Sequence, residues 1–280
     1  MKRKMFLLII ICLLFFSCET VQGIFNSIGA SVSETSSNNN SSSSDSQNRI
    51  STTSTTTSQT ARNDPNRRAA QDTANWDIAT LDTAANVDYL TGIEKDVILE
   101  MNKVRKNPKK YAELYISPML QYNWGGPFGA NSYLAPGETV YTITKEGKNG
   151  IQSCINDLSK RQSMLPLLPA MGLFLAAKDH VNDTGPKGIT GHTGSDKSSM
   201  GQRMNRYGKW DKGAGENISY GHNNGRDIVI QLIVDDGVSN RGHRNNILNQ
   251  NFKYASGAIG SHSNFSFMCV IDYASEYADK

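Results

Sequence analysis

Three short segments of the sequence place ionisable side chains next to glycine. They are residues 191–196 (Gly-His-Thr-Gly-Ser-Asp), 215–221 (Gly-Glu-Asn-Ile-Ser-Tyr-Gly) and 235–248 (Asp-Asp-Gly-Val-Ser-Asn-Arg-Gly-His-Arg-Asn-Asn-Ile-Leu). Glycine lets the backbone approach a ligand closely, and loops held on a rigid scaffold often carry function. Imidazole nitrogens and carboxylate oxygens both bind Zn²⁺ at about 2.0–2.2 Å. These segments therefore supply the atoms of a metal site, which only the fold could assemble because His192 and His243 are far apart in sequence.

The adjacent carboxylates of Asp235 and Asp236 end an apolar run. At the C-terminal end of a helix the backbone already presents partial negative charge, so two carboxylates there need a cation to balance them. Arg241 and Arg244 could provide it in a structural salt-bridge cluster, and a metal ion could provide it in a binding site. The spacing alone leaves both interpretations open.

The elements that must position these segments can be predicted from local patterns. Residues 91–94 (Thr-Gly-Ile-Glu) form a capping box before apolar residues at helical spacing. Residues 227–236 predict a short apolar helix that ends at a glycine, and residues 184–226 predict mostly loop. Residues 255–260 and 265–274 are the best strand candidates; the second is apolar on both faces and is expected at the centre of a sheet. Helices followed by strands favour a layered α+β domain.

The start of the chain has the features of an export signal. Residues 2–4 (Lys-Arg-Lys) precede an apolar run at 5–16, and Ser-Cys follows at 17–18. Twelve residues rise only about 18 Å as a helix, short of the roughly 30 Å hydrocarbon core of a bilayer, which argues against a membrane span. The segment resembles a bacterial lipoprotein signal, in which Cys18 becomes the lipidated first residue of the mature chain. An ordinary secretory signal with an incidental cysteine is the alternative.

The composition divides the chain into a signal peptide at 1–18, a disordered Ser/Thr/Asn-rich tether at 19–75 and a folded domain at 76–280. Residues 31–60 contain 23 Ser, Thr or Asn. Such a segment cannot bury enough apolar surface to offset about 1–2 kcal/mol of backbone entropy per residue. We therefore expect a domain tethered to a membrane through Cys18, in the bacterial cell envelope, at the outer membrane or cell surface rather than at the cytoplasmic membrane.

The charge balance argues against one class of partner. The chain has 29 Lys and Arg against 26 Asp and Glu, a formal net charge of +3. The three cations at residues 2–4 account for this excess, so the predicted domain is close to neutral. A nucleic-acid binder would instead show a strongly basic domain with a clustered basic face. We expect a monomer that binds no nucleic acid.

The three glycine-rich segments, taken in order, resemble the motifs of the CAP superfamily. The matching motifs are His-Thr-Gly-Ser-Asp, Gly-Glu-Asn-Ile and Gly-His-Arg-Asn-Asn-Ile-Leu. This group comprises the cysteine-rich secretory proteins, antigen 5 and plant pathogenesis-related proteins, with many bacterial SCP-domain members. The resemblance covers roughly residues 90–275. It implies a three-layer α/β/α sandwich with a central mixed sheet and a surface cleft that contains two histidines and two acidic residues.

The motifs assign the four cleft residues in this sequence. His192 is the first histidine, Glu216 the first acid and His243 the second histidine. The second acid of the family follows a tryptophan by three positions on a helix; Leu232 occupies the tryptophan position, which selects Asp235. Asp236 is the alternative acid. The paired-cysteine framework of the family is missing from this chain.

Two classes of function follow from this resemblance. The first is a binding module without enzymatic activity, whose cleft binds zinc or another divalent cation through His192, His243, Glu216 and Asp235. Such a module could also bind a lipid or a protein, since lipid binding recurs in the family. The second is a metal-assisted, protease-like hydrolase in which Glu216 is the general base. We favour the first class.

Three further groups of residues carry expectations, and two of them leave alternatives open. Cys154 and Cys269 could form a disulfide, which an oxidising envelope permits, or could remain buried thiols. His222, in a Gly-His-Asn-Asn-Gly loop, is expected to be exposed. Aromatic side chains gather around the Gly-rich segment 116–141 and either pack that segment onto the domain or line a ligand groove: Tyr111, Tyr115, Tyr122, Trp124, Tyr133 and Tyr141.

Overall fold

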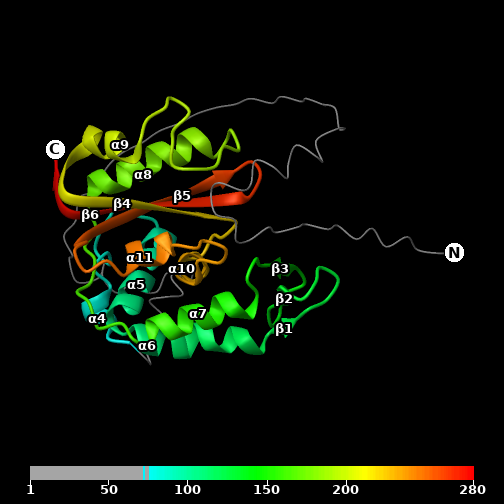
Figure 1. Ribbon diagram of the computed structural model, residues 1–280. Helices are drawn as coiled ribbons and strands as arrows, with labels where there is room; N and C mark the ends of the chain where they lie inside the picture. Colours follow the sequence, from blue (N-terminus) through cyan, green and yellow to red (C-terminus); the bar gives the residue numbers. More distant parts are fainter. Residues whose placement is uncertain (1–71, 73–75) are drawn as a thin grey trace, which may run out of the picture.

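The computed structural model describes residue 72 and residues 76–280 (Figure 1). The predicted export signal at 1–18, with Cys18, lies outside the described residues, as does the predicted tether at 19–75 except for Asp72. Within the described ranges, no helix is both long enough and apolar enough to cross a membrane.

The described chain is a mixture of helices and strands, and the predicted α+β class is confirmed. The helical segments are α4 (Ile78–Leu81), α5 (Gly92–Lys106), α6 (Pro108–Tyr111), the π-helical turn η1 (Ala112–Ile116), the 3-10 helix η2 (Ser117–Gln121), α7 (Lys148–Leu158), α8 (Met171–Thr184), α9 (Met200–Tyr207), α10 (Gly225–Val234) and α11 (Gly242–Ile247). The strands are β1 (Asn123–Trp124), β2 (Ser132–Leu134), β3 (Tyr141–Ile143), β4 (Gly208–Tyr220), β5 (Tyr254–His262) and β6 (Ser266–Asp279).

The main sheet has the strand order β4-β6-β5. The apolar strand β6 lies in the middle, as its pattern predicts, and both of its pairings are antiparallel. In the described residues, the parallel component expected of a mixed sheet is limited to a single bridge between Leu168 and Tyr254, at the β5 edge. Strands β5 and β6 are antiparallel because a tight hairpin joins them. Strand β4 pairs with the other edge of β6 and is also antiparallel to it.

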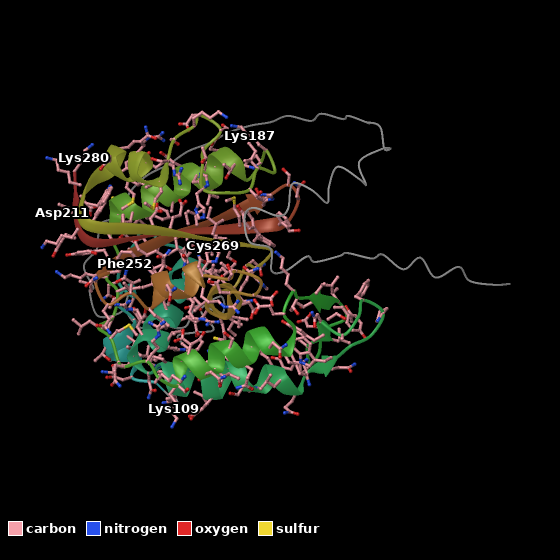
Figure 2. The ribbon with its side chains drawn as sticks, in the orientation of Figure 1. Lys109, Lys187, Asp211, Phe252, Cys269 and Lys280 are labelled. Carbon is pink, nitrogen blue, oxygen red and sulfur yellow. The ribbon has the colours of Figure 1, made fainter. Side chains whose placement is uncertain are left out.

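Helices cover both faces of this sheet (Figure 1). Helices α8 and α9 lie on one face, and α5, α10 and α11 lie on the other. Helices α6 and α7 and the small antiparallel sheet β1-β2-β3 lie farther out on the second side. The apolar stripe predicted for α5 is fully buried between the sheet and α10, and it includes Val97, Ile98, Met101 and Val104. Figure 2 shows Cys269 at the centre of the molecule, whereas Lys109 and Lys187 lie at its opposite outer faces.

Local sequence signals predict some ends of helices and strands and fail to predict others. The capping box predicted at 91–94 is present, with the Thr91 side chain and Glu94 each bonded to the backbone of the other. The prediction of mostly loop for 184–226 was wrong, because α9 and β4 lie there. Helix α10 ends at Val234, and the left-handed residue that caps it is Asp235, with φ 56°, rather than Gly237. This ending turns the chain so that the Asp235 side chain faces the start of α11.

Candidate functional site

His192 and Glu216 form the first of two histidine–carboxylate pairs. Nδ1 of His192 lies 2.7 Å from Oε1 of Glu216. The His192 side chain is 47% exposed, whereas that of Glu216, on β4, is only 2% exposed. The other Glu216 oxygen accepts a 2.6 Å bond from Nη2 of Arg203, a buried residue of α9. The pair therefore presents an accessible imidazole on a buried carboxylate whose two oxygens each have a partner.

The loop that carries His192 is held by two hydrogen bonds of the Gly191 backbone. The carbonyl of Gly191 accepts a 2.7 Å bond from Nε2 of His180, and its N–H donates to the Tyr220 hydroxyl at 3.0 Å. His180 is buried in α8, and burial lowers its pKa. His192 is thus held by backbone bonds as well as by Glu216.

Charges behind Glu216 set its protonation state. Burial alone would raise the pKa of Glu216, but the bond from His192 and the Arg203 guanidinium hold it below its usual range. Asp272 lies directly opposite Glu216 in the β4–β6 register and is fully buried. Burial and the negative charge of Glu216 raise the pKa of Asp272 well above its ordinary value. Glu216 is therefore the ionised member of this cross-strand pair, and Asp272 favours its neutral form.

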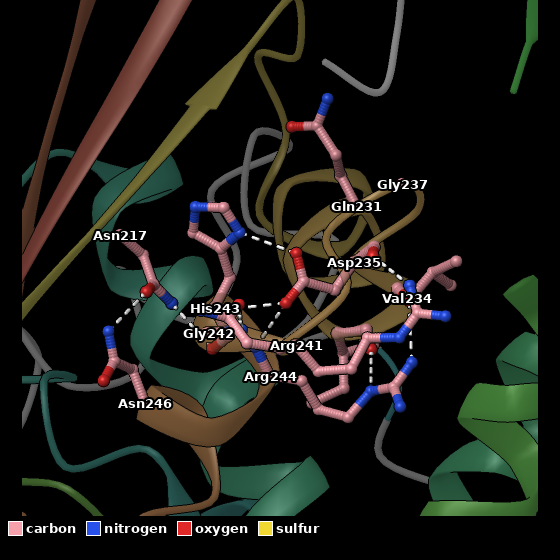
Figure 3. Close-up of polar contacts among 12 residues, drawn as sticks. Asn217, Gln231, Val234, Asp235, Gly237, Arg241, Gly242, His243, Arg244 and Asn246 are labelled. Carbon is pink, nitrogen blue, oxygen red and sulfur yellow. Dashed lines mark hydrogen bonds and ion pairs between the residues drawn. The ribbon is translucent and has the colours of Figure 1, made fainter. Parts of the chain in front are cut away.

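His243 and Asp235 form the second pair (Figure 3). Nδ1 of His243 lies 2.6 Å from Oδ1 of Asp235. The second Asp235 oxygen accepts the backbone N–H groups of His243 at 3.0 Å and Arg244 at 3.2 Å, at the start of α11. Figure 3 shows the other ring nitrogen of His243 pointing away from Asp235. The Asp235 side chain is 1% exposed and that of His243 is 19% exposed, so this imidazole is less accessible than His192.

Asp236 has a different role from Asp235. Its oxygens accept backbone N–H bonds from Lys145 and Glu146, just before α7. Burial raises the pKa of Asp236, although these two donors oppose the effect. The side chain thus attaches the end of α10 to the loop before α7, and it is Asp235 that contacts His243.

The two arginines expected to balance the aspartates bond to other groups. Arg241 forms a two-pronged pair with Glu146 at 2.6 Å and also donates to the Asp235 carbonyl. Arg244 is buried and donates to the last carbonyls of α10, those of Ile233 at 2.6 Å and Val234 at 2.7 Å. Their positive charges therefore neutralise the C-terminal end of α10 itself, where backbone carbonyls lack helical partners.

Two asparagines join the histidine–carboxylate pairs. Asn217 follows Glu216 on β4, and its side-chain amide donates to the His243 carbonyl at 3.0 Å. Asn246 on α11 donates to the Glu216 carbonyl at 3.3 Å and to the Asn217 side chain at 2.9 Å. The backbone segments carrying Glu216 and His243 are therefore neighbours, which is what the predicted cleft requires.

A comparison with protein families identifies the domain that contains both pairs. Residues 152–273 match the sequence model of the CAP family, the cysteine-rich secretory protein family. The chain carries a CAP domain. The resemblance based on three motifs is confirmed, and the matched region includes His192, Glu216, Asp235 and His243. Helix α5 packs against this CAP domain but precedes the matched residues.

Two solved bacterial structures are similar to this chain. An outer surface protein of Borrelia burgdorferi is 16% identical, with a TM-score of 0.35, over 47% of this chain and 96% of that chain. An extracellular protein containing a SCP domain from Bacillus anthracis is 19% identical, with a TM-score of 0.32, over 48% of this chain and 45% of that chain. A comparison with curated proteins finds no match.

The residues that support the pairs in the CAP domain were missed by sequence reasoning. Arg203 lies in a stretch predicted as loop, although Ser199 and Gln202 form a capping box that signals the start of α9. Asn217 and Asn246 stand inside the quoted motifs, but nothing in their spacing indicates that they contact each other. These residues act through contacts between β4, α9 and α11, which a linear pattern does not reveal.

The cysteines of the described chain are both free thiols. Cys154 and Cys269 are buried and unpaired, which decides between the two alternatives for this pair. Burial raises the pKa of Cys154 to about 12 and also raises that of Cys269. A thiol with a raised pKa is a poor nucleophile at neutral pH, so both side chains serve packing.

Proposed function

We propose that this chain is a CAP-domain binding module of the bacterial cell envelope, and that its cleft binds one divalent cation, preferably zinc, between His192 and His243. One observation supports the cation: the Nδ1 atom of each imidazole faces a buried carboxylate, at 2.7 Å and 2.6 Å. A carboxylate only accepts, so Nδ1 carries the proton and Nε2 of the neutral ring keeps its lone pair. That tautomer, held by a carboxylate, is the one that metal-binding histidines use.

In this proposal the two acids orient the ligands instead of binding the ion. Both oxygens of Glu216 and both oxygens of Asp235 already accept bonds from protein groups. In the described part of the chain, no group of three or more His, Cys, Asp or Glu side chains is placed to hold a metal ion together. Two imidazoles would therefore share the ion with water, and binding would be weaker than at a structural site with four protein ligands.

The same contacts do not favour the hydrolase alternative. A general base must lie within hydrogen-bond reach of the proton that it removes, and the Glu216 side chain is only 2% exposed. The Glu216 oxygens are engaged by His192 and by Arg203, and the Arg203 bond is buried. Binding is thus the better-supported function of the cleft. A lipid or protein ligand, the monomeric state and the lack of a nucleic-acid partner remain predictions.

Zinc titration of the full chain by calorimetry tests the cation. We expect one zinc per chain, with binding lost in both His192→Ala and His243→Ala, because each imidazole supplies one bond to the same ion. Asp235→Asn should weaken binding by about 10- to 100-fold, because it removes the group that orients His243. Asp196→Asn is the matched control, since this exposed acid belongs to the His192 segment but bonds Arg206.

Unchanged zinc binding in both histidine variants would refute the cation site. A stoichiometry of two that falls to one in each histidine variant would refute the shared ion. A zinc-bound crystal structure gives a second check. Imidazole rings more than about 8 Å apart could not share an ion, since each nitrogen must lie about 2.1 Å from it.

A further inference from the structure

A cavity of about 360 Å³ lies between the small sheet and α10, and its described lining residues include none of the four residues of the histidine–carboxylate pairs. Its walls come from the end of η2, from the β2–β3 hairpin and from α10. A volume of this size is within the range of small-molecule sites, which combine apolar walls with a few convergent polar groups. His222, expected to be exposed, is half-buried here and lines the cavity.

The apolar wall of the cavity is built from rings that are already packed together. Tyr122 and Tyr133 both line it, with ring centroids 5.5 Å apart. The Trp124 ring packs against Tyr133, with ring centroids 4.8 Å apart. Aliphatic side chains add to this wall: Met119, Ala135, Val140 and Ile230. Tyr133 is 6% exposed, so most of its ring is covered by neighbouring groups. Of the two roles considered for the aromatic cluster, these rings have both, since they pack the segment and line a cavity.

The charged groups that face this cavity are negative. The carboxylates of Glu138 and Asp227 line it, and the described residues that line it include no lysine or arginine. Arg226, next to Asp227 in sequence, bonds Glu100 and Asp72 instead. Asp227 itself accepts a bond from the Asn224 side chain at the start of α10, which fixes its position.

The charge of Asp227 acts on the other groups of the cavity. Burial raises the pKa of Tyr122 and Tyr133, and the negative charge of Asp227 raises both further. Burial lowers the pKa of His222, and Asp227 opposes that effect. At neutral pH the two tyrosines are therefore uncharged phenols, and the cavity combines aromatic faces with two carboxylates.

We propose that this cavity binds an organic ammonium ion whose charged nitrogen lies between Asp227 and Glu138 and whose apolar body packs against Tyr122 and Tyr133. The negative face of a tyrosine ring attracts a cation, most strongly when the cation is desolvated. The carboxylates add charge-assisted hydrogen bonds that a neutral ligand could not make. This site is separate from the cation site proposed for the imidazoles and does not need a metal.

The test is calorimetry of the full chain with phenethylammonium and with its neutral counterpart 2-phenylethanol, both in EDTA so that metal binding plays no part. We expect the ammonium to bind at least about tenfold more tightly than the alcohol, since only the ammonium pairs with the carboxylates. Added salt should weaken the ammonium alone. Asp227→Asn and Glu138→Gln should each reduce its affinity toward that of the alcohol.

The matched control is Glu113→Gln. Glu113 is an exposed carboxylate of η1, its side chain is 62% exposed, and it does not line the cavity. The affinity of the Glu113→Gln chain for phenethylammonium should equal that of the unmodified chain. Three results would each overturn the proposal: no binding of phenethylammonium, equal affinity for the neutral alcohol, or unmodified affinity in both carboxamide variants. Because Glu138 is on an exposed loop, Glu138→Gln remains informative even if Asp227→Asn perturbs α10.

Discussion

Each Glu216 oxygen has a partner of a different kind. Oε1 meets the His192 imidazole, which is 47% exposed, and Oε2 meets the Arg203 guanidinium, which is 1% exposed. Removing one partner of a buried ion pair leaves a charge without compensation, which is far more destabilising than losing an exposed partner. Arg203 therefore stabilises the fold, whereas His192 is available to a ligand.

Replacing Arg203 by methionine should lower the free energy of unfolding by about 3–5 kcal/mol, because the buried Glu216 carboxylate loses its guanidinium. Chemical denaturation at neutral pH measures the change. Arg206→Met is the matched control on the same helix. Arg206 is 42% exposed, and its replacement should change stability by less than about 1 kcal/mol.

An acid titration of the same two variants provides a second measurement. The pKa of Glu216 is below its ordinary 4.5 in the folded chain. Its contribution to stability is therefore complete above pH 4.5 and is lost as the pH falls through the lower folded-state pKa. Without Arg203 the folded-state pKa of Glu216 should rise toward 4.5, so the loss of stability on acidification should be smaller and should end at a higher pH. Equal stability of both variants at neutral pH would contradict this account of Arg203.

At the scale of elements, α5 and α10 touch through a glycine. Gly225 is the first residue of α10 and is buried against α5. A Cβ atom built on it would lie 2.6 Å from the Asp96 carbonyl carbon and 2.8 Å from the Val97 nitrogen. Backbone atoms of a packed helix cannot yield as the end of a flexible side chain can. The contact therefore requires a residue without a side chain.

Gly225→Ala should destabilise the fold by about 1–3 kcal/mol, since the added methyl group overpacks the contact with α5. The change in thermal midpoint measures this effect. Gly201→Ala is the matched control in α9, where the nearest atom to a new Cβ is at 3.4 Å, an ordinary contact. There alanine should be neutral or stabilising, because it reduces the entropy of the unfolded chain. A Gly225→Ala chain as stable as Gly201→Ala would refute the close approach.

Elements with strong local signals could be predicted, and those formed by distant partners could not. The Thr91 capping box and the apolar run of β6 identify α5 and the central strand. Strand β4 begins with Gly208 and Lys209 and lacks an alternating apolar pattern, so its sequence does not predict a strand. It is held in the sheet by its pairing with β6. The motif selected Asp235, but the role of Asp236 depends on the loop at residues 145–146, about 90 positions earlier. The cavity beside α10 likewise depends on segments that are distant in sequence.

At the scale of the whole molecule, the proposed location depends on Cys18, outside the described residues. Cys18→Ser should move the protein from the detergent phase to the aqueous phase in Triton X-114 partitioning, because one replaced sulfur removes the attachment point of the lipid. Cys12→Ser is the matched control within the apolar run of the same signal, and it should remain in the detergent phase. A Cys18→Ser chain that still partitions with detergent would show that the anchor lies elsewhere.

Asp72, the one described residue of the predicted tether, contacts the folded domain. Its carboxylate is bonded by Arg226 at 2.9 Å and by the Tyr115 hydroxyl, and it lies 3.6 Å from the buried ammonium of Lys103. These partners belong to α10, η1 and α5. In the proposed anchored state, a mechanical pull from the membrane would reach this ionic clamp before it reached either histidine. The clamp would bear that load first, so the arrangement of the two histidine–carboxylate pairs could persist under tension.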